Sequence, residues 1–224
     1  MQEYEMPAGS GKCIQRPYEN EPKISPEEQR KYRSGVGILL YLVKFSRPNI
    51  SNAVRELSKV IDGATPAHMK SMLRSIKFVM VTRQRVLSFD LREQEGSQWA
   101  LKAFSDSDCA GSKDDRRSIM GYCIYLNGCL ISSKSRGKKH VTLSSTEAEY
   151  MAVSEVCTEI MFSRMILEFL NFKIERLVKV YCDNVGEIFI GNNAKQSVRK
   201  KHIDVRYHFI REYVVDGMVE IVFV

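Results

Sequence analysis

The dipeptide Asn127-Gly128 constrains the fold of this chain more than any other short segment. It separates two strand-like runs, Gly121–Leu126 and Cys129–Ser133. Asn-Gly is a preferred pair for the two-residue turn that joins antiparallel strands, because both residues of that turn need positive φ. The pattern therefore predicts a β-hairpin near the middle of the chain.

The segments around this hairpin predict the rest of an α/β domain. Val86–Leu91 and Gln98–Phe104 are predicted strands, and Ser144–Leu170 is a predicted long helix. The remaining predicted elements are a buried strand over Leu177–Cys182, short helices over Asn184–Asn192 and Ile203–Val215, and a last strand over Met218–Val224. The order β-β-β-α-β-α-α-β predicts a mixed sheet with helices packed on it.

The N-terminal part of the chain has a helical pattern instead. Ser25-Pro26-Glu27-Glu28 predicts a helix start, since Ser caps, Pro suits the first position and acids favour the N-terminal dipole. Helical spacing then runs to residue 45, continues over Ile50–Ile61 and resumes from Thr65-Pro66 to near Arg85. On its third stretch Met69, Met72, Leu73, Ile76 and Val79 are predicted to share one face.

These patterns divide the chain into three predicted parts. Residues 1–30 hold most of the prolines and are predicted to be a linker. Residues 31–90 are predicted to form a small helical segment, and residues 95–224 the larger α/β domain.

Composition excludes several other classes. The chain has 224 residues, 44% of them apolar and 27% charged, which is ordinary for a globular protein and excludes disorder or a coiled coil as the main feature. No apolar run reaches the ~18 residues of a spanning helix, and the acidic start is unlike a signal peptide. We expect a soluble intracellular protein, cytoplasmic or nuclear, that is not secreted and has no membrane partner.

The cysteines do not predict a metal site. They form no C-x-x-C pair and lie far from the histidines in sequence, and a disulfide framework is unusual in a domain of this size. We expect buried free thiols at Cys13, Cys109, Cys123, Cys129, Cys157 and Cys182.

Positive charge is concentrated in two short clusters. The net charge is +7, and the clusters are Arg136-Gly-Lys-Lys-His140 and Arg199-Lys-Lys-His202. Such clusters suit a polyanion, because phosphate contacts release counterions. A solvated surface loop is an equally open interpretation of each cluster.

Three carboxylates stand at the predicted ends of elements. Asp106 comes just after the strand predicted to end at Phe104, Asp183 directly follows a predicted strand, and Glu149 lies in the first turns of the long helix. Ligands of mixed sheets collect where strands end and helices begin. Carboxylates there can converge on a hard cation, which prefers oxygen ligands.

Glu149 has two open interpretations. It lies in line with an apolar helical stripe at Ala152, Val153, Val156, Ile160 and Leu167. A carboxylate on a buried face is costly unless it is paired or binds a metal. Thr146-x-x-Glu149 also matches a capping box, so ligand and cap remain equally open. Glu147 points nearly the opposite way and suits a box with Ser144.

Asp106 and Asp108 compete for one role. They are two residues apart, so they share a face in extended backbone and either could be the ligand. The alternative is a turn-forming Asx pair before Gly111, which composition alone favours.

Several stretches together resemble one family. They are Phe104-Ser-Asp-Ser-Asp-Cys-Ala-Gly111, Leu143-Ser-Ser-Thr-Glu-Ala-Glu-Tyr-Met-Ala152, Tyr181-Cys-Asp-Asn184 and Lys201-His-Ile-Asp-Val-Arg-Tyr-His-Phe-Ile-Arg211. They resemble the ribonuclease H domain of Ty1/copia-type retrotransposon Pol polyproteins. Tyr32-Arg-Ser-Gly-Val-Gly37 and Tyr41-Leu-Val-Lys-Phe-Ser-Arg-Pro-Asn-Ile50 resemble the segment that connects the reverse transcriptase to that domain. The resemblance covers about residues 25–224.

The resemblance implies a ribonuclease H-like α/β fold, with a five-stranded mixed sheet in the order 3-2-1-4-5 and helices on its faces. It implies endonucleolytic hydrolysis of RNA in RNA–DNA hybrids with two Mg²⁺ ions, for which Mn²⁺ can substitute. It assigns metal binding and catalysis to Asp106, Glu149 and Asp183. Two metal ions activate water and stabilise the leaving oxygen, so no protein nucleophile is needed.

The resemblance also implies partners. They are the RNA–DNA hybrid, whose 2′-hydroxyls mark the strand to be cut, and the reverse transcriptase portion of the same polyprotein. The candidate phosphate contacts are Arg136, Lys138, Lys139, Arg199, Lys200, Lys201 and His202. Asp204 is interpreted first as a helix cap and only second as a site residue.

Two departures from the family pattern define an alternative function. A fourth metal-binding Asp and a final helix are expected after the last strand, but the sequence stops at Val224, so we expect a truncated domain with one sheet face partly uncovered. The only Asp-Asp pair, Asp114-Asp115, lacks the polymerase signature around it. The alternatives to a ribonuclease H are a non-catalytic nucleic-acid-binding remnant and a relic without selected function.

Overall fold

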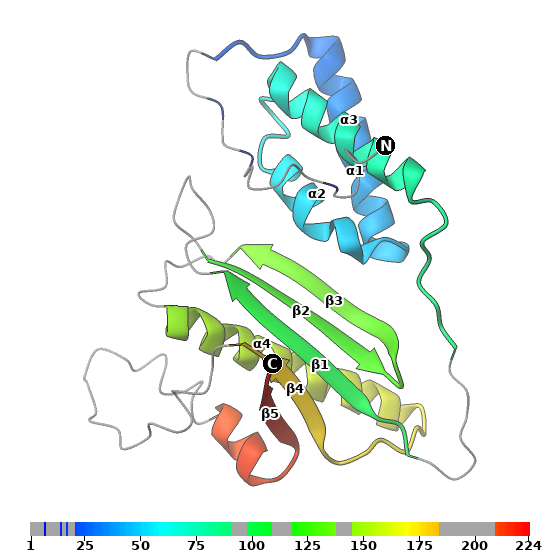
Figure 1. Ribbon diagram of the computed structural model, residues 1–224, viewed down its shortest axis with the longest axis vertical. Coiled ribbons are helices and arrows are strands. Elements are labelled where there is room, and N and C mark those ends of the chain that lie inside the picture. The colour runs from blue at the N-terminus through cyan, green and yellow to red at the C-terminus, as the bar shows by residue number, and fades with distance from the viewer. Residues whose placement is uncertain are drawn as a thin grey trace. The chain divides into compact units, whose positions relative to one another are not determined.

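The computed structural model describes residues 7, 14, 17, 21–90, 98–108, 118–137, 145–183 and 209–224 (Figure 1). The chain divides into two compact units. A helical unit comprises residues 1–87 with 112–115, and a sheet unit comprises residues 88–111 with 116–224. Each unit has its own hydrophobic core.

The helical unit follows the predicted helices closely. Its elements are α1 (Pro26–Phe45), the 3₁₀ turn η2 (Pro48–Ile50), α2 (Ser51–Ser58) and α3 (Pro66–Val81). The predicted start of α1 is confirmed by a capping box, in which Ser25 Oγ accepts from the Glu28 amide at 3.3 Å and Glu28 Oε2 accepts from the Ser25 amide at 3.0 Å. The predicted linker over 1–30 is therefore wrong from Pro26 onward, because the cap starts the helix there.

The core of the helical unit packs the three helices together. Tyr32, Leu57 and Phe78 are buried in it, and the Tyr32 hydroxyl donates to the Leu57 carbonyl at 2.9 Å. The predicted apolar face of α3 is confirmed at Met72 but wrong at Leu73, which is 54% exposed. Phe78, which the prediction omitted, fills the core instead.

The sheet unit contains five strands in one mixed sheet (Figure 1). They are β1 (Leu101–Asp108), β2 (Ile119–Leu126), β3 (Cys129–Gly137), β4 (Val178–Cys182) and β5 (Val219–Phe223). The order is β3-β2-β1-β4-β5, which confirms the predicted order 3-2-1-4-5. β1, β2 and β3 pair antiparallel, whereas β4 is parallel to both β1 and β5.

The predicted hairpin is confirmed between β2 and β3. Asn127 and Gly128 have φ of 45° and 85°, the positive values that the two-residue turn requires. The Asn127 side chain also accepts from the Ala100 amide at 2.8 Å, which ties the turn to the start of β1.

Three strand predictions need correction. Residues 86–90 form no strand, although Val86–Leu91 was predicted as one. β1 runs past Phe104 to Asp108, and β3 runs past Ser133 to Gly137. Both extensions are polar, so side-chain hydrophobicity could not predict them. They are strands because their backbones pair with β2.

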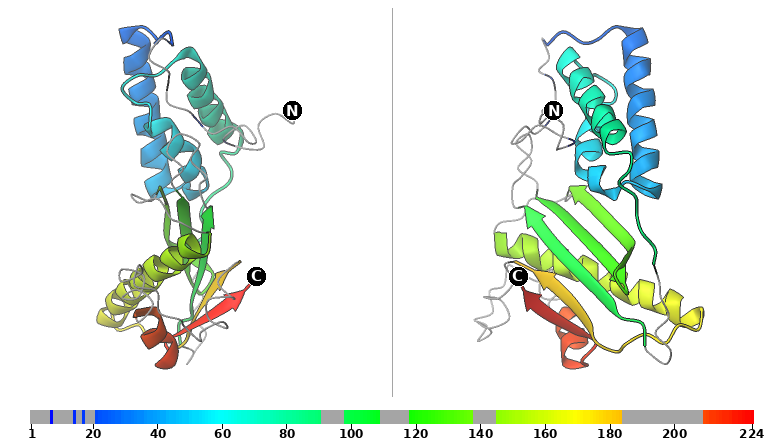
Figure 2. Two further views of the ribbon diagram at one scale, coloured as in Figure 1. Left: turned by 90° about the vertical axis from the view of Figure 1, so that its left-hand side faces the viewer. Right: turned by 45° about the vertical axis from the view of Figure 1, so that its right-hand side comes forward.

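One face of the sheet is covered by helices (Figure 2). The helix α4 (Ser145–Phe169) and residues 209–215, which are also helical, contribute Val153, Val156, Ile160 and Ile210 to the core beneath the sheet. The predicted helix over Ile203–Val215 is confirmed for 209–215, while Asn184–Asn192 lies outside the described residues. No helix in the described ranges is long and apolar enough to cross a membrane.

Three of the described cysteines are buried, as predicted. They are Cys129, Cys157 and Cys182, whereas Cys123 is half-buried, and these four form no disulfide. Burial, with a smaller contribution from Cys182, raises the pKa of the Cys157 thiol to about 12, so this thiol stays neutral at physiological pH. Cys13 and Cys109 lie outside the described residues.

Candidate metal centre

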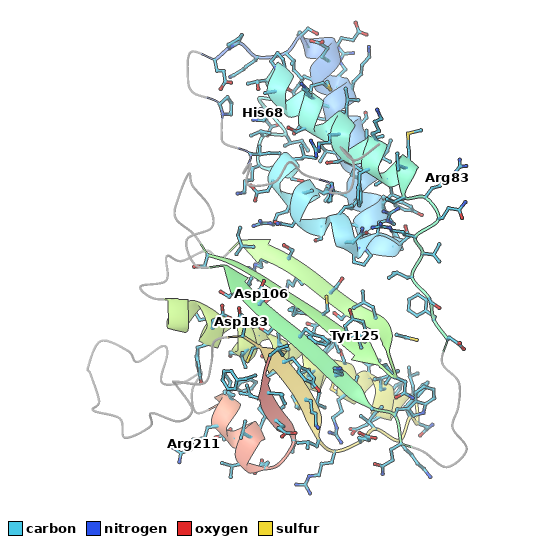
Figure 3. The ribbon with its side chains drawn as sticks, viewed as in Figure 1. His68, Arg83, Asp106, Tyr125, Asp183 and Arg211 are labelled. Carbon is cyan, nitrogen blue, oxygen red and sulfur yellow. The ribbon has the colours of Figure 1, made fainter. Side chains whose placement is uncertain are left out.

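The sheet topology brings two aspartates to one edge. Asp183 directly follows β4, as predicted. Asp106 lies within β1, opposite Gly121 of β2, so its predicted place after the strand is wrong. Because β1 and β4 are adjacent and parallel, their carboxyl ends meet at the same edge of the sheet, where Figure 3 labels both aspartates.

Glu149 reaches this edge from the helix layer. It lies near the start of α4, and its side chain is only 3% exposed. The residues in line with it, Val153, Val156 and Ile160, are fully buried in the core. The predicted apolar stripe is therefore confirmed, and the packing of this stripe holds Glu149 in place against the sheet.

The three carboxylates converge. One ligand oxygen from each of Asp106, Glu149 and Asp183 lies within 4.8 Å of the others. Asp106 and Asp183 are exposed, whereas Glu149 is buried beneath them. Three elements distant in sequence thus present oxygen atoms to one small volume with an open side.

Convergence favours one of the two interpretations of Glu149. A helix cap needs only its own first turn, whereas a ligand needs neighbours of the same chemistry, and Glu149 has two. The Thr146 side chain, on which the capping box depends, lies outside the described residues. The role of Glu149 as a ligand remains a prediction, which the geometry supports.

The arrangement suits a hard cation chemically. Carboxylate groups this close repel one another, and a divalent cation between them removes that repulsion. Oxygen ligands are those that Mg²⁺, Mn²⁺ and Ca²⁺ prefer. The donor set therefore fits a divalent metal ion.

Asp108 is the last residue of β1. Asp106 and Asp108 pair with Gly121 and Ile119 of β2, so the turn-forming alternative is wrong for their backbones. The Asp108 side chain lies outside the described residues, and its candidacy as a ligand stays a prediction.

Of the candidate phosphate contacts in the two basic clusters, only Arg136 is among the described residues. Arg136 lies on β3 opposite Met120, so the loop interpretation is wrong there. Its guanidinium lies 3.9 Å from Glu155 of α4, whose carboxylate also binds Lys134 Nζ at 2.9 Å. The other candidates, Lys138, Lys139, Arg199, Lys200, Lys201, His202 and Asp204, lie outside the described residues.

Sequence reasoning missed a motif beside the carboxylates. Both strands that end at the candidate centre carry a Lys, an aromatic residue and an Asp at alternate positions. The two copies are Lys102-Ala-Phe104-Ser-Asp106 and Lys179-Val-Tyr181-Cys-Asp183. The signal was the period of two, which became visible as a shared face only when the two strands were seen to be neighbours.

Comparisons with known proteins identify relatives over nearly the whole chain. No family model matches it. It is 36% identical over a 221-residue alignment, which covers 96% of this chain, to the retrovirus-related Pol polyprotein from transposon RE1 of Arabidopsis thaliana. It is 36% identical over 190 residues, or 85% of its length, to that from transposon TNT 1-94 of Nicotiana tabacum. The chain spans 15% and 14% of the lengths of these relatives.

Solved structures give weaker similarity. A structure of LC11-RNase H1 in complex with an RNA/DNA hybrid is 13% identical, with a TM-score of 0.37 that covers 55% of this chain and 84% of that one.

The identity to transposon proteins extends through both units, and the sheet has the strand order that the resemblance to the ribonuclease H domain implied. The chain therefore belongs to the family of retrovirus-related Pol polyproteins of transposons, of which it matches one segment.

Proposed function

We propose that this chain is a metal-dependent ribonuclease H of a Ty1/copia-type retrotransposon Pol polyprotein, which cleaves the RNA strand of RNA–DNA hybrids. The observation that carries the proposal is the convergence of Asp106, Glu149 and Asp183 within 4.8 Å at one edge of the sheet. Family membership supports the same assignment.

Asp106, Glu149 and Asp183 would hold the metal. Carboxylate oxygens within 4.8 Å of one another could serve one divalent ion or two. Divalent ions held by these three carboxylates would supply an activated water for in-line attack on a phosphodiester and would stabilise the leaving oxygen. We propose two Mg²⁺ ions, for which Mn²⁺ can substitute.

The three carboxylates have different roles because they differ in burial. Glu149 is held rigidly because the rest of its helical face is buried in the core. Asp106 and Asp183 lie on the solvent side, so a polyanionic substrate can reach the metal from there. The carboxylates thus bind and orient the metal, and the sheet edge leaves one side open for the nucleic acid.

Recognition of the hybrid would depend on the basic residues. Arg136 is the described member of the predicted set, and its side chain is 46% exposed although Glu155 lies nearby. We propose it as a phosphate contact, together with Lys138, Lys139, Arg199, Lys200, Lys201 and His202. The 2′-hydroxyls in the wide minor groove would distinguish RNA from DNA.

The helical unit supports a second partner, the reverse transcriptase portion of the polyprotein. Ile38, Tyr41 and Phe45 lie on one side of α1 at helical spacing and are each more than half exposed. The Tyr41 and Phe45 rings contact each other with centroids 4.7 Å apart. Contiguous exposed apolar side chains typically mark a protein interface. We propose that this side of α1 packs against the polymerase portion.

Cleavage of a labelled RNA–DNA hybrid with Mg²⁺ or Mn²⁺ tests the proposed activity. We expect the full chain to cut only the RNA strand, and Asp106→Asn and Asp183→Asn to lose at least about 100-fold in rate, because a ligand is lost. Asp216→Asn, an exposed aspartate of the same unit outside the cluster, is the matched control and should keep full activity.

Two outcomes would contradict the proposal. Cleavage unchanged in Asp183→Asn would remove the cluster from the reaction. Salt-dependent hybrid binding without any cleavage by the parent chain would indicate the alternative, a non-catalytic nucleic-acid-binding module.

A further inference from the structure

The two Lys-x-aromatic-x-Asp motifs lie side by side on the face of the sheet opposite α4. Residues at alternate positions of a strand share a face. The intervening residues Ala103 and Val180 are fully buried on the helix side, so the motif residues face the other way. The paired strands bring Lys102 opposite Lys179 and Phe104 opposite Tyr181.

The aromatic pair is the last fixed step before the carboxylates. Among the described residues, Phe104 and Tyr181 form the final pair of the β1–β4 ladder. Asp106 lies two residues further along β1, about 6.6 Å in extended backbone, and Asp183 lies two residues past Tyr181, just after the end of β4. The lateral distance between the two aspartates therefore depends on how these two strands are held at the aromatic step.

Aromatic side chains at this position connect β1, β2 and β4 through ring contacts. The Phe104 and Tyr181 rings stack with centroids 5.1 Å apart and an interplanar angle of 22°. Tyr125 of β2, labelled in Figure 3, meets Phe104 edge-on at 5.8 Å. Lys102 Nζ lies 4.6 Å from the Tyr181 centroid and 5.1 Å from the Phe104 centroid, so one cation contacts both rings.

We propose that the stacked Phe104–Tyr181 pair is a positioning element of the metal centre. The backbone ladder sets the spacing of β1 and β4, and the stack at its last pair restrains how the two strands continue to Asp106 and Asp183. Glu149 is held independently by α4, so the pair controls only the aspartate side of the centre. The inference rests on the proposed function, because it takes these carboxylates as metal ligands.

Mn²⁺ binding to the full chain tests this role without relying on catalysis. Free Mn²⁺ is measured by electron paramagnetic resonance during a titration. We expect Phe104→Leu to raise the Mn²⁺ dissociation constant roughly 10-fold, as for other residues that orient ligands. Tyr181→Leu, which removes the other ring, should weaken binding similarly, so the test does not depend on one variant folding. Tyr181→Phe keeps the stack and should bind like the parent.

A second aromatic pair in the same unit provides the matched control. Trp99 and Phe172 contact each other at 5.2 Å beside the start of β1, at the opposite end from Asp106. Phe172→Leu makes the same chemical change there and should leave the Mn²⁺ affinity unchanged.

The outcomes separate this inference from the proposed function. Parent binding of Mn²⁺ with unchanged affinity in Phe104→Leu and Tyr181→Leu would overturn the positioning role and leave the metal centre standing. Equal weakening in Phe172→Leu would overturn it as a general loss of stability. Failure of the parent to bind Mn²⁺ would overturn the metal centre, and the positioning role with it.

Discussion

The two units of this protein obtain their structures from contacts of different range. In the helical unit, consecutive helices pack on one another, and the buried Tyr32–Leu57 hydrogen bond joins neighbouring elements. In the sheet unit, β1 pairs with β4 across an intervening hairpin and α4. Local packing is enough for a core, whereas the parallel pairing of distant strands brings the candidate ligands Asp106 and Asp183 together.

The distribution of carboxylates follows this difference. In the part of the chain that the structure describes, the group able to hold a metal ion lies in the sheet unit and contains Asp106, Glu149 and Asp183. The helical unit uses its acids differently, as when Glu28 caps α1 and Asp62 pairs with Arg33 at 2.9 Å. One unit is predicted to carry the chemistry, and the other to provide contacts within the polyprotein.

The largest difference between the two units is expected when a core side chain of one unit is truncated. Phe78→Ala should lower the stability of the helical unit by about 3–5 kcal/mol, and Ile160→Ala that of the sheet unit by about 2–5 kcal/mol, because both side chains are fully buried. Hydrogen exchange resolved by segment should show lost protection mainly in the unit that carries the substitution. Equal loss in both units from either variant would contradict the independence of the two cores.

Metal binding should distinguish the units by a smaller amount. Mn²⁺ at about 100 times its dissociation constant should raise the free energy of unfolding of the sheet unit by about 2.7 kcal/mol, because only the folded state assembles the three ligands. Segment-resolved hydrogen exchange should show no such rise in the helical unit. Glu149→Gln is the control, and a rise of the same size in that variant would contradict binding at this cluster.

The smallest expected difference concerns alkaline pH. The pH at which stability begins to fall should differ by about one unit between the two parts of the protein. Burial raises the pKa of Tyr32 in the helical unit from its ordinary 10 to about 12. In the sheet unit, burial raises the pKa of Cys157 from 9 to about 12. Each folded state holds its proton more tightly than the unfolded state does, so its stability is full below the unfolded pKa and falls as pH rises. The sheet unit should weaken from about pH 9, and the helical unit from about pH 10.

The single tryptophan allows this difference to be measured. Trp99 lies in the sheet unit, so the denaturant midpoint of its fluorescence reports on that unit. Burial also raises the pKa of Cys123 in this unit. Cys157→Ala should therefore reduce the fall in midpoint between pH 9 and 10, whereas Tyr32→Phe should leave that fall unchanged. The assignment fails if the two variants behave alike.

Local signals in the sequence determined many of the elements. Asn127-Gly128 predicted the hairpin because few residue pairs tolerate two positive φ angles, and Ser25 predicted the start of α1 because its hydroxyl and Glu28 cap each other. The periodicity of α4 predicted that Glu149 would face the core. These features depend on backbone preferences and on spacing within a few residues, so a single sequence is enough to predict them.

The order of the sheet came from the family resemblance rather than from the spacing of residues. Composition and pattern predicted a mixed sheet but did not choose among its possible orders. The resemblance implied 3-2-1-4-5, and the structure has that order. Which strands become neighbours depends on the packing of the whole unit, so local patterns cannot specify it.

Only the tertiary structure decided where the strands end and what lies beside the carboxylates. Residues 105–108 are polar and were excluded from β1 by pattern, yet they are a strand because β2 supplies their backbone hydrogen bonds. The repeated motif at Phe104 and Tyr181 has no meaning in either strand alone, since the stack exists only where β1 and β4 pair. The sequence alone therefore identified the candidate ligands by their residue type and spacing. The distances between them could come only from the tertiary structure, because the strands that carry them are far apart in the chain.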